Sequence, residues 1–208
     1  MRFSLIALSL CLTLSAQAAS YTFNQDQSSA EFEIIKFKIG AKVQGKFKKF
    51  DGTAELDEKK MELSKVNSTV QLNSVDTSEE KRDTHLKSED FFDAGKFPTM
   101  IFASTGTMSV KTAFDMPGKL TIKGVTKDVT FKVARSETKE NAYVFIASAT
   151  INRLDYGVSW NKGLEQGDWK SVSGILGKAV LNDNVDIKMT IKLVPVAPAA
   201  PATTTKKK

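Results

Sequence analysis

The single histidine of the 208-residue chain, His85, is the first residue to consider for chemistry. A serine hydrolase would need a nucleophile on a strained turn within hydrogen-bond reach of that histidine, and the sequence gives no sign of such a turn. A transition-metal site would need more nitrogen or sulfur ligands than one histidine supplies. Two interpretations of His85 and its neighbour Arg82 stay open. They fix a helix in place, or they contact the head group of a ligand.

Acidic residues gather in the same region, at Glu79 and Glu80 and again at Glu89, Asp90 and Asp93. Paired carboxylates can act as general acid and base or bind calcium, but this run lacks the alternating oxygen ligands and the glycine of a calcium loop. Carboxylates also stabilise the N-terminus of a helix. We interpret these as capping and solvated surface residues, and we expect no metal, no cofactor and no enzymatic activity.

Arg153 and Asp155 stand two residues apart at the end of a predicted strand, so their side chains are expected to point the same way. We predict a local ion pair between them that closes this end of the domain.

The N-terminus has the pattern of a secretory signal peptide. Arg2 precedes an apolar run from Phe3 to Leu14, and Ala16-Gln17-Ala18 is a cleavage site of the A-x-A type. The run is shorter than the roughly 20 apolar residues of a membrane-spanning helix. We predict a signal peptide over residues 1–18 and export to the periplasm or beyond. Because Cys11 leaves with this segment, the mature chain has no disulfide.

The C-terminal residues 195–208 are rich in proline, alanine, threonine and lysine, so we predict that they are disordered and that residues 19–194 form one domain. Without Arg2 the chain carries 29 basic and 24 acidic residues, a net charge of +5. The basic residues alternate along the sequence rather than cluster, which does not indicate a nucleic-acid surface. Lys206 to Lys208 would attract an anionic membrane only weakly.

Alternation of apolar and polar residues dominates the predicted domain. It is clearest where Val185, Ile187, Met189, Ile191 and Leu193 alternate with polar residues, and it recurs over residues 66–73, 100–110, 129–133 and 143–151. The pattern predicts antiparallel strands that pack in a closed barrel or a two-sheet sandwich. We expect turns at Asp51-Gly52, Met116-Pro117-Gly118, Lys123-Gly124 and Lys139-Glu140-Asn141.

One segment breaks the alternation. Thr77 and Glu80 have the spacing of a capping box and predict a short helix over about residues 78–87. Phe91, Phe92 and Phe97 would pin this helix to an open end of a barrel.

A second irregular stretch, about residues 161–177, is predicted to form a lid-like loop. Trp160 and Trp169 would line a pocket or anchor that lid.

A series of motifs spans nearly the whole predicted domain: Gly45-Lys46-Phe47, Ser74-Val75-Asp76-Thr77, Arg82-Asp83-Thr84-His85-Leu86, Ser88-Glu89-Asp90-Phe91-Phe92, Gly118-Lys119-Leu120-Thr121-Ile122-Lys123-Gly124 and Asn152-Arg153-Leu154-Asp155-Tyr156-Gly157. Together they resemble the YceI-like family of periplasmic polyisoprenoid-binding proteins. The resemblance implies an all-β fold, an eight-stranded antiparallel lipocalin-like β-barrel with an elongated apolar pocket for a long isoprenoid chain. It implies no enzymatic activity. Many members carry a histidine near the end of the first long strand, where this chain has Lys36, which we place with Arg82 and His85 in a possible polar rim.

The inward faces of the strands supply the candidates for a pocket wall. The pattern alone favours an ordinary filled core, and the resemblance favours a ligand pocket. The candidate ligand-binding residues are Phe32, Ile34, Phe47, Val70, Leu72, Phe102, Leu120, Ile122, Phe131, Val133, Phe145 and Ile187. Burying a CH2 group contributes roughly 0.8 kcal/mol and association costs on the order of 4 to 15 kcal/mol, so a chain of some 20 or more carbons binds without a charged anchor.

We therefore expect an exported protein that sequesters or carries a long isoprenoid, either polyprenyl or quinone-like. Two alternatives stay open. One is a periplasmic hydrolase or isomerase that acts on a lipid-linked substrate near His85. The other is a packed scaffold that binds another envelope protein, which a continuous apolar cavity of several hundred cubic ångströms would exclude.

Overall fold

The computed structural model describes residues 18–36, 41–136, 143–159 and 181–196. Several predicted features lie outside these residues: most of the signal peptide, the turn at Lys139-Glu140-Asn141, the lid-like loop with Trp160 and Trp169, and the tail beyond Val196.

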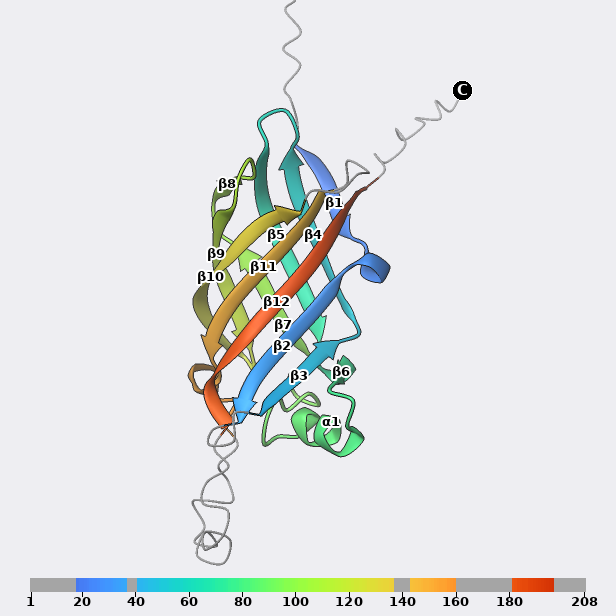
Figure 1. Cartoon of the computed structure of the whole chain (residues 1–208), viewed down its shortest axis with the longest axis vertical. Coiled ribbons are helices and arrows are strands. Elements are labelled where there is room, and N and C mark those ends of the chain that lie inside the picture. Colours follow the sequence, from blue (N-terminus) through green and yellow to red (C-terminus); the bar gives the residue numbers. More distant parts are fainter. Residues whose placement is uncertain (1–17, 37–40, 137–142, 160–180, 197–208) are drawn as a thin grey trace, which may run out of the picture.

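The described strand segments form one closed antiparallel barrel (Figure 1). The segments are β1 (Ala19–Phe23), β2 (Ser29–Lys36), β3 (Lys42–Phe47), β4 (Phe50–Asp57), β5 (Glu62–Gln71), β6 (Val75–Asp76), β7 (Thr99–Ser104), β8 (Thr107–Ser109), β9 (Phe114–Ile122), β10 (Val125–Ser136), β11 (Tyr143–Asn152) and β12 (Leu181–Pro195). Short 3-10 helices connect some of them: η1 (Gln25–Gln27), η2 (Leu72–Ser74) and η3 (Arg153–Tyr156).

Several consecutive segments continue one another along the barrel wall. β2 and β1 lie in succession along the same edge of β12, and β3 and β4 pair with them in turn. β7 and β8 likewise both pair with β5. The wall therefore consists of eight strands, as the resemblance implied.

Pairing between the two ends of the domain closes the barrel. β12 pairs with β11 over residues 184–193 on one side and with β2 and β1 on the other. The rest of the wall follows chain order: β4 pairs with β5, β5 with β7, β7 with β9, β9 with β10 and β10 with β11. This closure decides between the barrel and the sandwich that the alternation left open.

The predicted alternation holds along β12, where Ile191 and Leu193 are buried and Asp186 and Lys188 are exposed. The polar residues face water, and the apolar ones join a single core inside the barrel. That core includes residues from every strand of the wall, so burial of one face per strand stabilises the closed barrel.

β5 departs from the alternation at one point. Leu63 and Val66 are both buried although they are three positions apart, an odd spacing that would put them on opposite faces of a regular strand, and Lys65 between them has a φ of 49°. The register between β4 and β5 shifts between Thr53 and Glu55, opposite this position. An extra residue of this kind bends a strand and restores its apolar side chains to the inner face.

The turns predicted at Asp51-Gly52 and Met116-Pro117-Gly118 are wrong, because both glycines lie inside strands. A phenylalanine from the neighbouring strand occupies the space of the missing side chain. A Cβ on Gly52 would lie 2.2 Å from the Phe23 ring, and a Cβ on Gly118 would lie 2.4 Å from the Phe102 ring. Glycine in a strand interior can mark such a close approach as well as a turn.

The α-helix α1 (Glu80–Lys87) lies within the predicted range, but its N-terminus differs from the predicted capping box. Asp83 Oδ1, rather than the Glu80 side chain, accepts hydrogen bonds from Thr77 N at 2.9 Å and Thr77 Oγ1 at 2.5 Å. The reason is that the N-cap is Glu79, two residues after Thr77, so an acid on the following turn reaches back instead. Among the described residues, no helix is long and apolar enough to cross a membrane.

The last described strand extends slightly past the predicted domain boundary. β12 continues to Pro195, and Val196 N donates a hydrogen bond to Ser20 O at 2.9 Å. Pairing with β1 therefore includes the first residues of the predicted tail.

Candidate functional site

Two apolar cavities lie inside the barrel. The outer cavity, near α1, has a volume of about 120 Å³, and the inner cavity has a volume of about 60 Å³. The outer cavity is lined by Ala30, Glu31, Phe32, Ile34, Phe47, Val70, Leu86, Phe91, Phe92, Met100, Ile122, Ile151, Arg153, Val158, Val185, Ile187 and Met189. The inner cavity is lined by Phe23, Ala54, Leu63, Val66, Ser68, Phe102, Met116, Phe131, Val133, Phe145, Ala147, Met189, Ile191 and Leu193.

The two cavities follow one another along the barrel. On β12, Val185 and Ile187 line the outer cavity, and Ile191 and Leu193 line the inner one. Met189 stands between these pairs and lines both. The cavities therefore form an interrupted apolar path from the α1 end into the far half of the barrel, with Met189 at the interruption.

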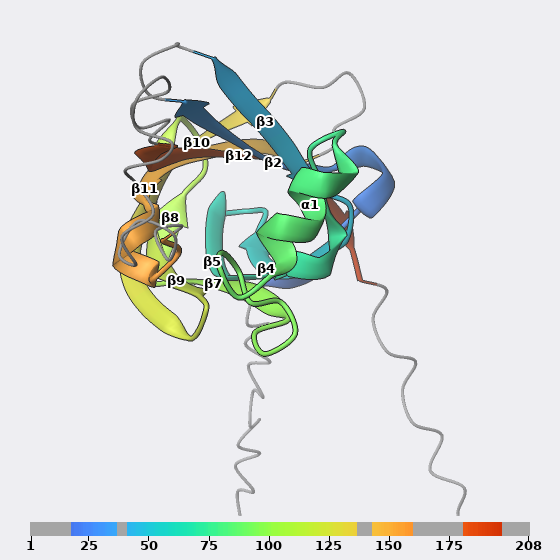
Figure 2. The same cartoon turned by 90° about the horizontal axis from the view of Figure 1, so that it is seen from below.

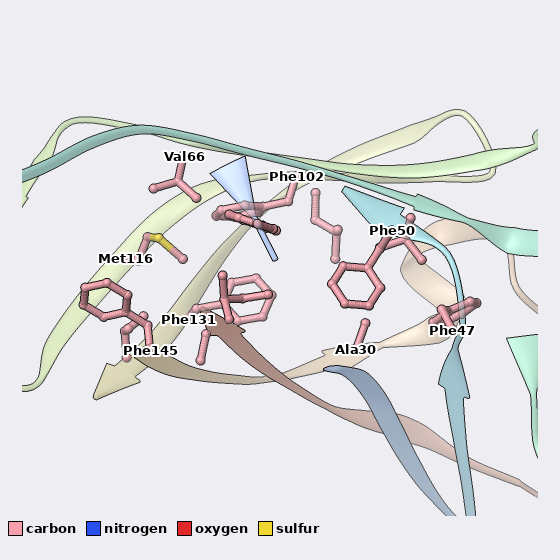
Figure 3. Packing of buried hydrophobic residues seen from close by; sticks show 14 of the residues in the cluster. Ala30, Phe47, Phe50, Val66, Phe102, Met116, Phe131 and Phe145 are labelled. Atoms are coloured by element: carbon pink, nitrogen blue, oxygen red, sulfur yellow. The ribbon is translucent and has the colours of Figure 1, made fainter. Parts of the chain in front are cut away.

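Aromatic rings fill much of the space around this path. Figure 3 shows Phe102, Phe131 and Phe145 pointing into the same part of the interior as Met116. Phe102 and Phe131 pack edge to face with ring centroids 5.1 Å apart. Both cavities are well below the roughly 300–1,000 Å³ of a typical small-molecule pocket. In this state the barrel is a largely packed core with two gaps.

The segment from α1 to β7 covers the outer cavity, and Figure 2 shows α1 lying across this end of the barrel. Leu86 of α1 and Phe91 and Phe92 after it line the cavity. Phe92 also packs against Phe47 of β3, with ring centroids 6.0 Å apart. These phenylalanines pin the helix to the barrel end, as predicted.

The predicted turn at Lys123-Gly124 ties this cover to the barrel. Lys123 Nζ donates to the carbonyl oxygens of Glu89 at 2.9 Å and Gly157 at 3.4 Å. A Cβ on Gly124 would lie 2.9 Å from the Phe97 ring, and the φ of 77° at this glycine suits a tight turn. Loop contacts therefore hold the cover on the barrel end.

Arg82, a predicted rim residue, is committed to local structure. Its Nε donates to Thr77 Oγ1 at 2.7 Å, its Nη2 donates to Thr77 O at 2.7 Å, and its Nη1 pairs with Glu79 at 2.7 Å. Arg82 lines neither cavity. Of its two predicted roles, these contacts support the structural one.

His85 lies 3.1 Å from Asp90 through Nε2, and its ring packs edge to face on Phe91 with centroids 5.0 Å apart. Both contacts hold the ring against the turn that follows α1. A hydrolase or isomerase centred on His85 stays a prediction, which unchanged turnover by His85→Ala would contradict. The Lys36 side chain lies outside the described residues.

Arg153 is the one basic residue among the described residues that line the outer cavity, and its predicted ion pair with Asp155 is wrong. Arg153 is only 7% exposed and donates to Asn182 O at 3.1 Å, Val158 O at 2.8 Å and Asp183 Oδ1 at 3.1 Å. Burial lowers the pKa of its guanidinium, and Asp183 opposes that shift. Two of the three partners lie about 30 positions away in β12, so spacing in the sequence favoured the nearer Asp155.

The predicted wall residues divide between the two cavities. Phe32, Ile34, Phe47, Val70, Ile122 and Ile187 line the outer cavity, and Phe102, Phe131, Val133 and Phe145 line the inner one. Leu72 and Leu120 are buried but line neither. Contact with a ligand stays a prediction for all of them.

The outer surface carries a larger groove of about 970 Å³ over β3, β2, β12, β11 and β10. Its lining mixes acidic and basic side chains, among them Glu33, Asp186 and Lys132, so it has the character of a solvated face. In the described part of the chain, no three His, Cys, Asp or Glu side chains gather as metal ligands would.

Comparison with known proteins agrees with this architecture. A UPF0312 protein of Pseudomonas paraeruginosa is 37% identical over 154 residues, which are 71% of this chain and 81% of that protein. The crystal structure of Burkholderia cenocepacia BcnA superposes with a TM-score of 0.65 at 22% identity, covering 82% of this chain and 98% of BcnA. A polyisoprenoid binding domain from Saccharophagus degradans has a TM-score of 0.59 at 14% identity, covering 86% of this chain and 99% of that domain. At these identities, the two structures support the fold alone.

The sequence model of the YceI-like domain matches residues 21–193, nearly the whole of the closed barrel. The chain therefore belongs to the YceI-like domain family.

Proposed function

We propose that this protein is an exported carrier that binds a long apolar chain, of the isoprenoid class, inside its barrel. The observation that supports this most is the pair of apolar cavities that follow one another along the barrel and meet at Met189. The Saccharophagus degradans neighbour is described as a polyisoprenoid binding domain, which suggests the ligand class. The predicted signal peptide supports a periplasmic location.

A long chain fits this barrel only if the interior opens. The chain enters at the α1 end, where Leu86 and Phe92 form the apolar inner surface of the cover. It reaches the far half of the barrel when the Met189 side chain moves aside. Methionine suits this role because its unbranched, flexible side chain adapts to irregular spaces.

Energetics favour a long ligand over a short one. Each buried CH2 contributes roughly 0.8 kcal/mol, and association costs on the order of 4 to 15 kcal/mol, to which the opening of the cover adds. A chain of about 20 carbons gains roughly 16 kcal/mol by the same measure, which exceeds the cost of association and leaves a surplus for opening the cover over most of that range. A chain of only a few carbons gains too little to offset the cost of association.

The test is native mass spectrometry of the protein purified from the periplasm of its own host, together with binding of a prenyl alcohol of about 20 carbons in vitro. A long-chain lipid retained in the native preparation, and saturable binding of the alcohol, are the expected results. Preparations that are repeatedly empty and bind no alcohol would contradict the proposal.

Ala30→Leu is the matched blocking variant. Ala30 is buried, lines the outer cavity and lies opposite Met189 in the register of β2 and β12. The larger side chain fills the outer cavity and reduces binding. Ala134→Leu makes the same change on the exposed face of β10 and leaves binding unchanged.

The small cavity volumes favour a second candidate, a packed scaffold whose surface binds another envelope protein. In that case the barrel carries no lipid. Ala30→Leu then raises the free energy of unfolding or leaves it unchanged, and the variant still binds the partner protein. Equal lipid content in Ala30→Leu and wild-type preparations would indicate lipid that adheres to the surface, because lipid bound inside the barrel should decrease when the outer cavity is filled.

A further inference from the structure

Ser68 is the one polar side chain among the residues that line the inner cavity. It lies on β5 between Gly52 of β4 and Phe102 of β7 in the strand register, and it is only 5% exposed. Its Oγ is buried and has no hydrogen-bond partner among the described residues. A buried hydroxyl without a partner is destabilising, because it has lost its hydrogen bonds to water and gained none in the protein.

A water molecule is a poor partner for this hydroxyl. A buried water needs two to four polar groups around it, and the other side chains that line the inner cavity are apolar. The backbone groups of β5 at this position are engaged with β4 and β7. A ligand that brings one polar atom of its own into an apolar space satisfies the hydroxyl better.

We propose that Ser68 Oγ anchors a single uncharged polar atom of the apolar ligand, a hydroxyl, carbonyl or amide oxygen, which enters the inner cavity first. This proposal rests on the proposed function and adds an orientation to it. The polar end lies deep in the barrel beside Ser68, and the hydrocarbon chain extends through the outer cavity toward α1.

The surroundings exclude a charged head group from this position. The residues that line the inner cavity include no Lys, Arg or His, and a phosphate buried there would have no cation to offset its desolvation. Arg153 lines only the outer cavity and is already hydrogen-bonded to Asp183.

The neighbours of Met189 allow the passage that this orientation requires. Met189 pairs with Ala30 of β2 on one side and Ala147 of β11 on the other. Both are small and buried, so the Met189 side chain has alanines rather than branched residues beside it when it turns toward the wall. Displacement of Met189 joins the two cavities without a change in the strand ladder.

The experiment compares three ligands: a prenyl alcohol of about 20 carbons, the matching hydrocarbon without the hydroxyl, and the matching prenyl phosphate. Dissociation constants are measured for the wild type, for Ser68→Ala and for the control Ser148→Ala, which removes a serine hydroxyl from the exposed face of β11. The wild type and Ser148→Ala are expected to prefer the alcohol over the hydrocarbon about 3- to 10-fold, as for one net hydrogen bond. Ser68→Ala is expected to lose this preference and to keep its affinity for the hydrocarbon.

A spectroscopic measurement tests the contact itself. The infrared carbonyl stretch of an isotope-labelled long-chain ketone is expected at lower frequency in the wild type than in Ser68→Ala, because only the wild type donates a hydrogen bond to it. Thermal unfolding of the empty Ser68→Ala variant is expected at or above the wild-type temperature, since an unpaired buried hydroxyl has been removed.

Two results would overturn the anchor while leaving the carrier function in place: an alcohol preference that survives in Ser68→Ala, or a phosphate that binds as tightly as the alcohol. Failure of the wild type to bind any of the three ligands would instead overturn the proposed function, and the anchor with it.

Discussion

The ring of Phe102 on β7 lies over Gly118 of β9, and a Cβ added to Gly118 would stand 2.4 Å from Phe102 Cε2 and 2.6 Å from the Ala103 carbonyl oxygen. Phe102 lines the inner cavity and packs on Phe131, so this glycine leaves room for an aromatic ring beside the barrel wall. A side chain at Gly118 forces the ring inward.

Gly118→Ala is therefore expected to lower the free energy of unfolding by about 1–3 kcal/mol, as overpacking of a filled core does. Urea unfolding followed by circular dichroism measures it. Gly95→Ala is the control, because no atom lies within 4 Å of its added Cβ, and its change should stay within about 0.5 kcal/mol. Equal stability of the two variants would contradict the role of the ring contact.

Arg153→Met tests the buried guanidinium. Removing it leaves the carbonyl oxygens of Val158 and Asn182 without this donor, and the free energy of unfolding should fall by about 2 to 3 kcal/mol. Asp183→Asn should cost less than about 1 kcal/mol, because the Asp183 side chain is 48% exposed. Asp155→Asn is the control for the pair predicted from the sequence. If it destabilised the protein as much as Arg153→Met, the partners seen here would be wrong.

Stability at alkaline pH depends on Tyr21. Burial first, and then the hydrogen bond from its hydroxyl to Glu58, raise the pKa of Tyr21 above its ordinary value of 10.0. The unfolded chain then releases this proton at lower pH than the folded chain, so stability is fully present below pH 10.0 and falls as the pH rises above it.

Tyr21→Phe is expected to flatten the fall of unfolding free energy between about pH 10 and 11, because the variant cannot titrate there. Chemical denaturation at a series of pH values measures the slope. Burial also raises the pKa of Tyr156, so Tyr156→Phe should remove a further part of the slope. Identical slopes in the wild type and the double variant would rule out both tyrosines as the source.

Asp83→Ala tests the attachment of α1. Loss of the two hydrogen bonds from Thr77 should cost about 1 kcal/mol and speed up amide hydrogen exchange in α1, as loss of a helix cap does. Glu80→Ala changes an exposed acid in the first turn and should have a smaller effect on exchange. The reverse order of effects would restore the capping box predicted from Thr77 and Glu80.

Local sequence determined much of the barrel. The alternation along residues 185–193 identified the buried face of β12, and the polar run after Thr77 identified α1 to within two residues. Ten of the twelve predicted wall residues line a cavity, since a period of two assigns every second side chain to the same face whatever the neighbouring strand is.

Contacts between distant segments needed the tertiary structure. Gly52 and Gly118 have the same neighbours in sequence as turn glycines, and only the position of Phe23 and Phe102 on adjacent strands makes them strand residues. Arg153 finds Asp183 rather than Asp155 because β12 lies beside the end of β11.

The sequence by itself determined which residues face inward, because side-chain direction along a strand depends on the backbone alone. Only the tertiary structure decided how completely those residues fill the interior. The volume left over depends on strand register, on ring orientation and on the position of Met189, and these arise from packing between segments far apart in the chain.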